Sequence, residues 1–273
     1  MAANSNKHGL TRYIPAIVRK HVRRRCGFGC VVCGCAVITY EHFNPPFRDA
    51  REHRAEGMTL LCGHHQLESS KGLLSKETIS KADFDPYCKQ KGYSNQTLDI
   101  GHSRPELYLG GTDVTICGPG IAVNGEMFFS LKRPEIRSKK WRLSAKFLSP
   151  DGSVACEIRD NELVVNSSLF DFEQKGTSFI ARNQKEIVLD LDLTPPNILS
   201  LNQYYLPLDK GIVYIGKRMM KKPLSDEEEL TSILEFRHQD GGTQTFASCK
   251  FSSEGGINFT LDNGGLKFGQ IPL

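Results

Sequence analysis

The chain has 273 residues, of which 39% are hydrophobic and 24% charged, as in an ordinary globular protein of one large or two modest domains. No apolar stretch approaches the roughly 20 residues of a membrane helix, and the N-terminus lacks an apolar signal-peptide core. We therefore expect a cytoplasmic protein that does not contact membranes. The net charge of +4 is uneven, because residues 1–81 contain 13 Lys and Arg against 6 Asp and Glu, whereas acids outnumber bases in the remainder. This asymmetry predicts that any polyanion binds the N-terminal part.

A basic helix is expected over residues 11–25, where apolar residues recur at helical spacing. Its polar face carries several basic side chains and no acid, and such a stripe can contact phosphates without reading a base sequence. The residues predicted to bind nucleic acid are Arg19, Lys20, Arg23, Arg24 and Arg25. The competing interpretation is a helix face that packs or keeps the protein soluble.

Two short cysteine-containing motifs follow this helix. Nine cysteines are an odd number for a disulfide framework, and four of them fall within residues 26–35, so the clustering indicates metal binding. One C-x2-C pair and one C-x2-H pair form the ligand set of a tetrahedral structural zinc site. The predicted ligands are Cys30, Cys33, Cys62 and His65. His65 is preferred to His64 because only His65 gives the two-residue spacing, and Cys26 and Cys35 remain alternative thiols.

Short elements are predicted between and after these motifs. Residues 37–40 are expected to form a strand, and residues 58–61 are a second apolar run that leads into the C-x2-H motif. Ser75 is a suitable N-cap for a helix over residues 76–84. The polar stretch over residues 85–105 is predicted to be a linker.

A histidine between the two motifs is the candidate for catalysis. Hydrolysis of a phosphodiester needs an activated water, and a histidine with a pKa near neutrality can take the proton from it. His42 follows the first predicted strand, and Glu41 beside it offers a hard oxygen ligand for Mg²⁺ or Mn²⁺. The pair Glu41 and His42 therefore predicts a catalytic centre.

The segment from about Arg19 to Ser75 resembles the HNH endonuclease family, whose His-Me finger fold is a zinc-bound hairpin and helix. The matching stretches are "RRRCGFGCVVCG", "ITYEHFNPPF" and "GMTLLCGHHQLESSKGLLS". The resemblance implies that the four Cys and His ligands hold structural zinc and that His42 is the general base. It also implies that Glu41 ligates the catalytic metal.

Two positions depart from the common family pattern. An asparagine usually stands five residues before the first cysteine of the second motif, where this chain has Gly57. A histidine usually follows the last zinc ligand, where this chain has Gln66. The alternatives are a weakened catalytic metal site, or one rebuilt with His53 or His64.

The C-terminal part has a different pattern of apolar and polar residues. The two-residue alternation of half-buried strands occurs at residues 141–147 and 187–193, with turn signals between such runs. This pattern predicts an all-β domain, with a sandwich as the leading arrangement and a β-solenoid as the alternative. The predicted α+β chain thus consists of a basic helix with a zinc-bound ββα His-Me finger (1–84), a linker (85–105) and a β-rich domain (106–273).

Three functions compete at this point. The first is a metal-dependent DNA endonuclease with structural Zn²⁺ and catalytic Mg²⁺ or Mn²⁺. Its β-rich domain would regulate cleavage or recognise a ligand, a protein partner or the target, as an oligomeric anti-phage or restriction enzyme requires. The second is a catalytically degenerate HNH-fold module that binds nucleic acid or a protein without cleaving. The third is an interaction or structural protein in which the basic helix merely packs.

Overall fold

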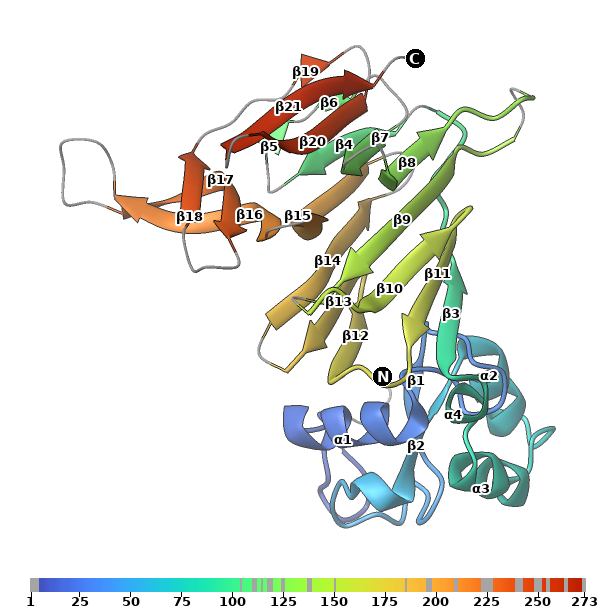
Figure 1. Cartoon of the computed structure of the whole chain (residues 1–273). Helices are drawn as coiled ribbons and strands as arrows, with labels where there is room; N and C mark the ends of the chain where they lie inside the picture. The colour runs from blue at the N-terminus through green and yellow to red at the C-terminus, as the bar shows by residue number, and fades with distance from the viewer. Residues whose placement is uncertain are drawn as a thin grey trace. The chain divides into compact units, whose positions relative to one another are not determined.

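The computed structural model divides into two compact units (Figure 1). Unit 1 consists of residues up to 96 together with a segment that returns from later in the chain, residues 164–174. Unit 2 consists of residues 97–163 and the chain from residue 175 onward. The residues that the structure describes are 5–103, 105–109, 112–113, 115–116, 120–123, 126–136, 139–149, 151–184, 186–194, 198–208, 211–221, 228–238, 243–247, 252–253, 256–262 and 265–271.

Unit 1 holds all the helices of the described residues, arranged around a two-stranded hairpin (Figure 1). In chain order its elements are α1 (Ala16–Cys26), β1 (Thr39–His42), the 3-10 turn η1 (Ala55–Gly57), β2 (Met58–Leu61), α2 (Gly63–Ser70), α3 (Lys76–Phe84), α4 (Tyr87–Lys91) and β3 (Tyr93–Thr97). The returning segment contributes the start of β12 (Asp171–Lys175). None of the helices in the described residues has the length and apolar content of a membrane span.

Helix α1 begins later than the sequence pattern predicts, because Pro15 is the N-cap residue rather than part of the first turn. The backbone of Pro15 is extended, with φ −54° and ψ 143°. The helix ends at Cys26 because Gly27 takes a left-handed conformation, with φ 74°, in which its N–H reaches back to the carbonyls of Arg23 and Arg24. A side chain at residue 27 would also approach the Cβ of Cys88 within 2.8 Å.

The predicted strand over residues 37–40 is shifted to Thr39–His42. The reason is the pairing with β2, in which Thr39 faces Leu61 and His42 faces Met58. The chain enters α2 directly after Leu61, so residues 37 and 38 have no strand residue opposite them. The strand predicted at residues 58–61 is confirmed, and all four of its residues are buried.

The helix over residues 76–84 is confirmed together with its cap. The Ser75 hydroxyl accepts a hydrogen bond from the backbone N–H of Thr78, at 3.0 Å, and so satisfies a donor at the helix start. Ile79 of this helix is fully buried and packs with apolar residues of α1 and β2. The core of unit 1 is the cluster Val22, Cys26, Cys30, Val31, Met58, Leu60, Leu61, Cys62 and Ile79.

Residues 85–105 are not simply a linker, since α4 and most of β3 belong to unit 1. Cys88 and Ser94 are fully buried. The backbone of Asn95 donates to the Gly34 carbonyl at 3.0 Å and accepts from the Ala36 N–H at 2.8 Å. These contacts attach β3 to the loop of the first cysteine motif, a long-range pairing that the polar sequence of this stretch does not reveal.

In unit 2 every regular element of the described residues is a strand. One sheet has the order β21-β20-β7-β8-β9-β10-β11, and another has the order β13-β14-β15-β16-β17-β18. Most neighbouring strands are antiparallel, unlike the parallel coils of a β-solenoid. The strand bounds are β4 (Glu106–Leu109), β5 (Thr112–Asp113), β6 (Thr115–Ile116), β7 (Gly120–Val123), β8 (Glu126–Lys132), β9 (Arg142–Leu148), β10 (Val154–Arg159), β11 (Glu162–Asn166), β13 (Ser178–Asn183), β14 (Glu186–Thr194), β15 (Ile198–Leu208), β16 (Gly211–Lys221), β17 (Glu228–His238), β18 (Thr243–Ala247), β19 (Ser252–Ser253), β20 (Gly256–Asp262) and β21 (Gly265–Ile271).

A buried tyrosine joins these two sheets. Tyr204 of β15 is fully buried, and its hydroxyl lies 2.8 Å from the carbonyl of Phe128 in β8 and 3.0 Å from that of Lys146 in β9. Its ring packs against Phe147 at a centroid distance of 5.4 Å. The alternation of buried and partly exposed residues in β9 and β14 follows the predicted pattern. The chain is thus α+β, with few helices and mostly strands, as predicted.

Candidate metal centre and histidine site

The first two metal-ligand candidates lie in the tight loop that follows α1. The backbone N–H of Cys30 donates to the Cys35 carbonyl at 2.9 Å, and the N–H of Gly34 donates to the Cys30 carbonyl at 2.8 Å. Gly34 has φ 80°, which glycine adopts without strain. These bonds turn the sulfurs of Cys30 and Cys33 toward α2.

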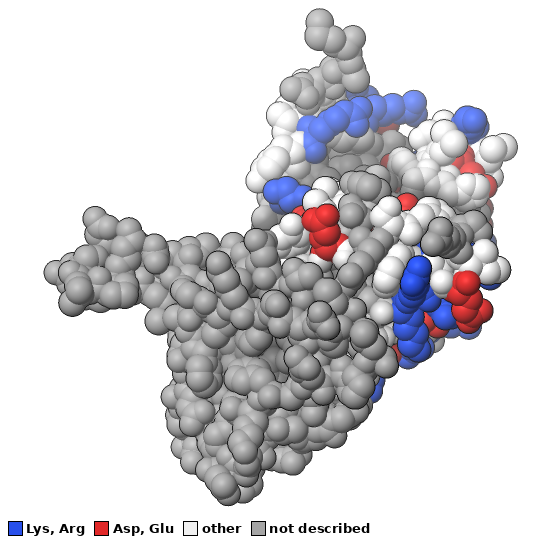
Figure 2. Space-filling view, turned by 90° about the horizontal axis from the view of Figure 1, so that it is seen from above, with Lys and Arg blue, Asp and Glu red and all other residues white. Residues whose placement is uncertain are grey.

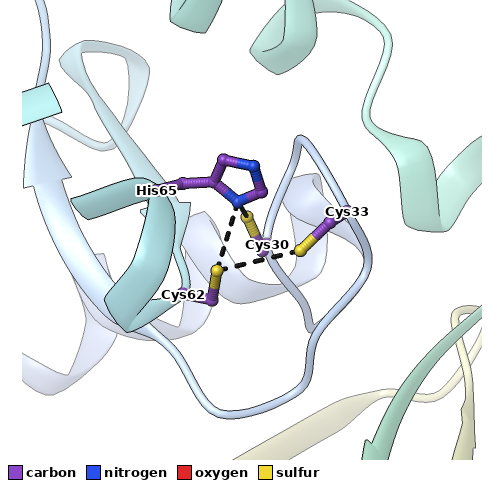
Figure 3. Close-up of side chains that lie close together, drawn as sticks. All are labelled: Cys30, Cys33, Cys62 and His65. Atoms are coloured by element: carbon purple, nitrogen blue, oxygen red, sulfur yellow. Dashed lines mark hydrogen bonds between the residues drawn. The ribbon is translucent and has the colours of Figure 1, made fainter. Parts of the chain in front are cut away.

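The other two candidates lie at the start of α2. Cys62 is the N-cap residue, and His65 lies in the first turn, so the helix itself fixes their separation. Figure 3 shows the three sulfurs and the His65 ring converging on one point. The cluster is partly buried, as a structural metal site requires.

The distances within this cluster fit a tetrahedral metal ion. Zn–S bonds of about 2.3 Å and Zn–N bonds of about 2.0–2.1 Å place neighbouring ligand atoms about 3.5–3.8 Å apart. The Sγ atoms of Cys33 and Cys62 are 3.8 Å apart, and His65 Nδ1 lies 3.4 Å from Cys30 Sγ and 3.2 Å from Cys62 Sγ. Without a metal, Cys30 and Cys33 share one proton, so their hydrogen bond lowers the pKa of Cys30 and raises that of Cys33. The four residues could therefore hold a metal ion such as zinc.

The two neighbouring cysteines, Cys26 and Cys35, contact other groups. Cys26 is buried 3.8 Å from the Thr59 hydroxyl and 3.8 Å from Asp83 Oδ1, and burial raises the pKa of its thiol to about 12. Cys35 donates to Gln96 Oε1 at 3.2 Å. Neither is in the four-residue cluster, which therefore brings together Cys30, Cys33, Cys62 and His65 rather than the alternative thiols.

Glu68 of α2 stands behind the metal cluster. Its carboxylate lies 3.9 Å from His65 Nε2, on the side of the ring opposite the sulfurs, and 3.3 Å from His64 Nε2. A carboxylate on the outer nitrogen of a ligating histidine helps to orient the ring. His64, His65 and Glu68 also lie close enough to hold an ion, but they share His65 with the first cluster. His64 therefore belongs to the surroundings of the zinc cluster and lies on its exposed side.

His42 lies at the end of β1 and is oriented by a second histidine. His53 Nε2 lies 3.0 Å from the Thr11 carbonyl, and this nitrogen must donate because a carbonyl only accepts. In neutral His53 the other nitrogen, Nδ1, is then an acceptor. His42 Nε2, at 3.0 Å from it, must be the donor. Because neutral His42 carries its proton on Nε2, its Nδ1 keeps an unprotonated lone pair.

The surroundings of His42 keep its ring neutral. Burial and the neighbouring His53 lower the pKa of His42 to about 4, against a smaller opposing effect of Glu41. His42 is 8% exposed and lines a cavity of about 270 Å³ with Asn44, Asp49, Arg51 and Arg54 among its other walls. Among the described residues, Nδ1 of His42 has no hydrogen-bond partner. It is also absent from the fully buried polar atoms that lack a partner, so Nδ1 is not sealed from solvent. An uncharged acceptor nitrogen is therefore accessible to a small molecule such as water.

Glu41 does not offer open oxygens for a catalytic metal. One of its carboxylate oxygens accepts from the ammonium of Lys76, and the other accepts from the Gln66 amide at 2.9 Å. Both ring nitrogens of His53 are also engaged, and His64 lies with the zinc cluster. Within the described part of the chain, Glu41, His53 and His64 therefore do not assemble into a second metal site. Sequence spacing gave no sign of the contact with Lys76.

The glycine at position 57 is required by the backbone. Its carbonyl accepts from the N–H groups of Phe43 and Asn44, at 3.1 and 3.2 Å. A Cβ on Gly57 would lie 2.1 Å from the Asn44 carbonyl oxygen, which no side chain can tolerate. The asparagine of the common family pattern consequently cannot be accommodated in this loop without rearranging it.

The basic stripe of α1 is largely neutralised by acids from distant positions. Arg23 is 5% exposed and forms a bidentate pair with Asp171, at 2.9 and 2.8 Å, with a further bond to the Tyr40 hydroxyl. Burial alone would lower the pKa of Arg23, but the Asp171 and Tyr40 contacts outweigh it and raise this pKa. Arg25 pairs with Asp83, and Arg19 contacts Glu173 at 3.5 Å. The prediction that all five bases face a nucleic acid is wrong for Arg23, which is buried.

Two bases of the stripe are held differently. Lys20 and Arg24 lie over the ring of Phe170, at 3.7 and 5.0 Å from its centroid, and both are at the surface. On the face seen in Figure 2, the described Lys and Arg side chains are interspersed with Asp and Glu rather than gathered in one basic patch.

Comparison with known proteins adds no family to these observations. No protein-family model, no curated protein and no solved structure matches the chain.

Proposed function

We propose that unit 1 is an HNH-type nuclease domain that hydrolyses phosphodiester bonds in DNA. The observation that carries the proposal is the accessible, uncharged Nδ1 of His42, held by the relay from His53 to the Thr11 carbonyl. The local order of elements supports it, since β1, β2 and α2 form a hairpin followed by a helix. The four Cys and His ligands stand where this hairpin and helix meet, as a zinc-bound His-Me finger requires.

In this proposal His42 is the general base. It takes a proton from water on Nδ1 as the water oxygen bonds to phosphorus and the scissile P–O bond breaks. The electron pair of that bond stays on the leaving sugar oxygen, which takes a proton from solvent. His53 accepts the hydrogen bond from His42 Nε2 both before and after this transfer, so the ring does not turn. The structural zinc, held by Cys30, Cys33, Cys62 and His65, keeps the hairpin and α2 together.

A plasmid-cleavage assay tests the proposal. Wild-type protein is incubated with supercoiled DNA in Mg²⁺, in Mn²⁺ and in a chelator that leaves the structural zinc bound. We expect His42→Ala to reduce cleavage about 100-fold or more, the usual weight of a general base. His102→Ala, which changes an exposed histidine of unit 2, is the matched control. Undiminished cleavage by His42→Ala would show that His42 is not the general base.

A specific contact favours a second candidate, a module of the same fold that binds DNA or a protein without cleaving. Glu41 is engaged by Lys76 and Gln66, so the carboxylate expected to take Mg²⁺ or Mn²⁺ already has a cationic partner. DNA binding by the wild-type protein without cleavage in any divalent metal would establish this candidate. Cleavage that requires Mg²⁺ or Mn²⁺ would instead exclude this candidate and favour the nuclease.

A further inference from the structure

A second cavity of unit 1, of about 490 Å³, lies beside the turn η1. Its walls come from α1, α4, η1 and the returning segment. The groups that can contact a ligand are His21, Arg24, Lys89, Ser167, Ser168 and Glu56. It thus combines basic groups and hydroxyls from three parts of the chain that are far apart in sequence.

The bases of this cavity differ from the neutralised bases of α1. Arg24 is exposed and contacts the face of Phe170, and it makes no ion pair within the described residues. Lys89 is exposed, and its ammonium donates to the backbone carbonyl of Ser167 at 3.0 Å; it forms no ion pair with any residue that the structure describes. Glu56 is the one carboxylate among the lining residues. Arg25 also lines the cavity but is paired with Asp83.

The cavity is separated from the His42 cavity by a single short turn. Arg54 and Gly57 line the His42 cavity, and the two residues between them, Ala55 and Glu56, line the basic cavity. The turn η1 therefore contributes to the walls of both cavities.

We propose that this cavity is a phosphate subsite for the nucleic-acid backbone, built by Arg24 and Lys89 with the hydroxyl of the buried Ser167 beside them. The inference rests on the proposed function and names where the substrate strand runs. Arg24 and Lys89 are exposed cations, and such groups position a backbone without reading its bases. The returning segment thereby takes part in substrate binding.

The test measures binding separately from cleavage. All proteins carry His42→Ala, and the affinity for a short labelled DNA duplex is measured in a chelator that spares zinc, over a series of salt concentrations. We expect Arg24→Gln with Lys89→Gln to weaken binding and to reduce the slope of log affinity against log salt by about 2, since each phosphate contact contributes about 0.9. The control, Lys71→Gln with Lys81→Gln, removes the same charge from exposed residues of unit 1 that do not line the cavity and should keep the slope.

Three results would overturn the subsite. In the first, the Arg24 and Lys89 variant keeps the slope and affinity of the control. In the second, the His42→Ala protein does not bind DNA at all. In the third, inorganic phosphate binds the cavity but DNA does not compete with it, which would indicate a site for a free anion. The plasmid assay judges the nuclease proposal independently, because cleavage can persist when this subsite is removed.

Discussion

At the scale of single residues, the orientation of His42 follows from one backbone carbonyl. The Thr11 carbonyl accepts from His53 Nε2, which makes His53 Nδ1 an acceptor and His42 Nε2 a donor. The free lone pair of His42 Nδ1 is thus decided by a residue some thirty positions earlier in the chain. His53, which the sequence offered as a rebuilt metal ligand, acts on His42 through a hydrogen bond.

The titration of His42 tests the neutral state of its ring. The ring should titrate near pH 4, and in His53→Ala its pKa should rise toward the ordinary value of about 6.5, because part of the burial and the neighbouring His53 are removed. NMR of the ring carbons during a pH titration measures both values, with His102→Asn as the control that leaves His42 unchanged. A His42 pKa near 6.5 in the wild type would contradict the neutral, buried ring.

The lowered pKa of His42 also determines how the free energy of unfolding changes with pH. The folded state disfavours the protonated ring, so the unfolded chain binds more protons between about pH 4 and 6.5. Through His42, the free energy of unfolding rises with pH across this window. Cleavage that depends on neutral His42 should likewise rise through about pH 4.

At the scale of elements, two rigid pieces meet at the zinc cluster. The loop after α1 supplies Cys30 and Cys33 through its own backbone hydrogen bonds, and the first turn of α2 supplies Cys62 and His65. Each piece is ordered locally, and a metal ion bound by the cluster would join them. The ion would then hold α2 against the β1–β2 hairpin, next to the strand that carries His42.

A pair of cysteine substitutions in one loop tests the zinc assignment. We expect one zinc per wild-type chain by elemental analysis, and loss of that zinc in Cys33→Ser, with loss of the cooperative unfolding of unit 1, because structural zinc contributes directly to folding. Cys35→Ser lies two residues away and is bonded to Gln96 rather than to the cluster, so it should retain zinc and fold normally. Equal zinc loss in both variants would contradict the assignment.

At the scale of the whole molecule, unit 1 is assembled from two separate stretches of chain. The buried Arg23 of α1 is satisfied by Asp171 and Glu173, which belong to the returning segment. The charge that marks α1 as basic in the sequence is thus part of the connection that holds residues 164–174 in this unit. Folding of the N-terminal unit consequently depends on residues that follow several strands of unit 2.

Replacing the two neighbouring arginines separates this structural role from surface charge. Arg23→Leu should destabilise unit 1 by about 3–5 kcal/mol, since it leaves Asp171 buried without its partner. Arg24→Leu removes the same charge from an exposed position and should change stability by only about 0.5 kcal/mol. Urea unfolding monitored by hydrogen exchange in α1 peptides measures the difference. Similar values for the two variants would show that the Arg23 pair is not important for stability.

Local chemistry by itself determined several features of this protein. The spacing of Cys30, Cys33, Cys62 and His65 predicted the cluster, because tight turns and a helix start fix such ligands over a few residues. Apolar alternation and the Ser75 cap predicted β2, α3 and the strand-rich C-terminal part for the same reason, since each depends on neighbours in the chain.

Only the tertiary structure decided what the polar groups contact. It paired Glu41 with Lys76, His42 with His53, and Arg23 with Asp171, contacts that span 11 to 148 positions in the sequence. The physical reason is that a charged side chain is satisfied by whichever opposite group the folded chain brings within a few ångströms, and neither spacing nor composition records that distance. The metal scaffold could thus be read from the sequence, whereas the state of the catalytic candidates and the true partners of the basic helix could not.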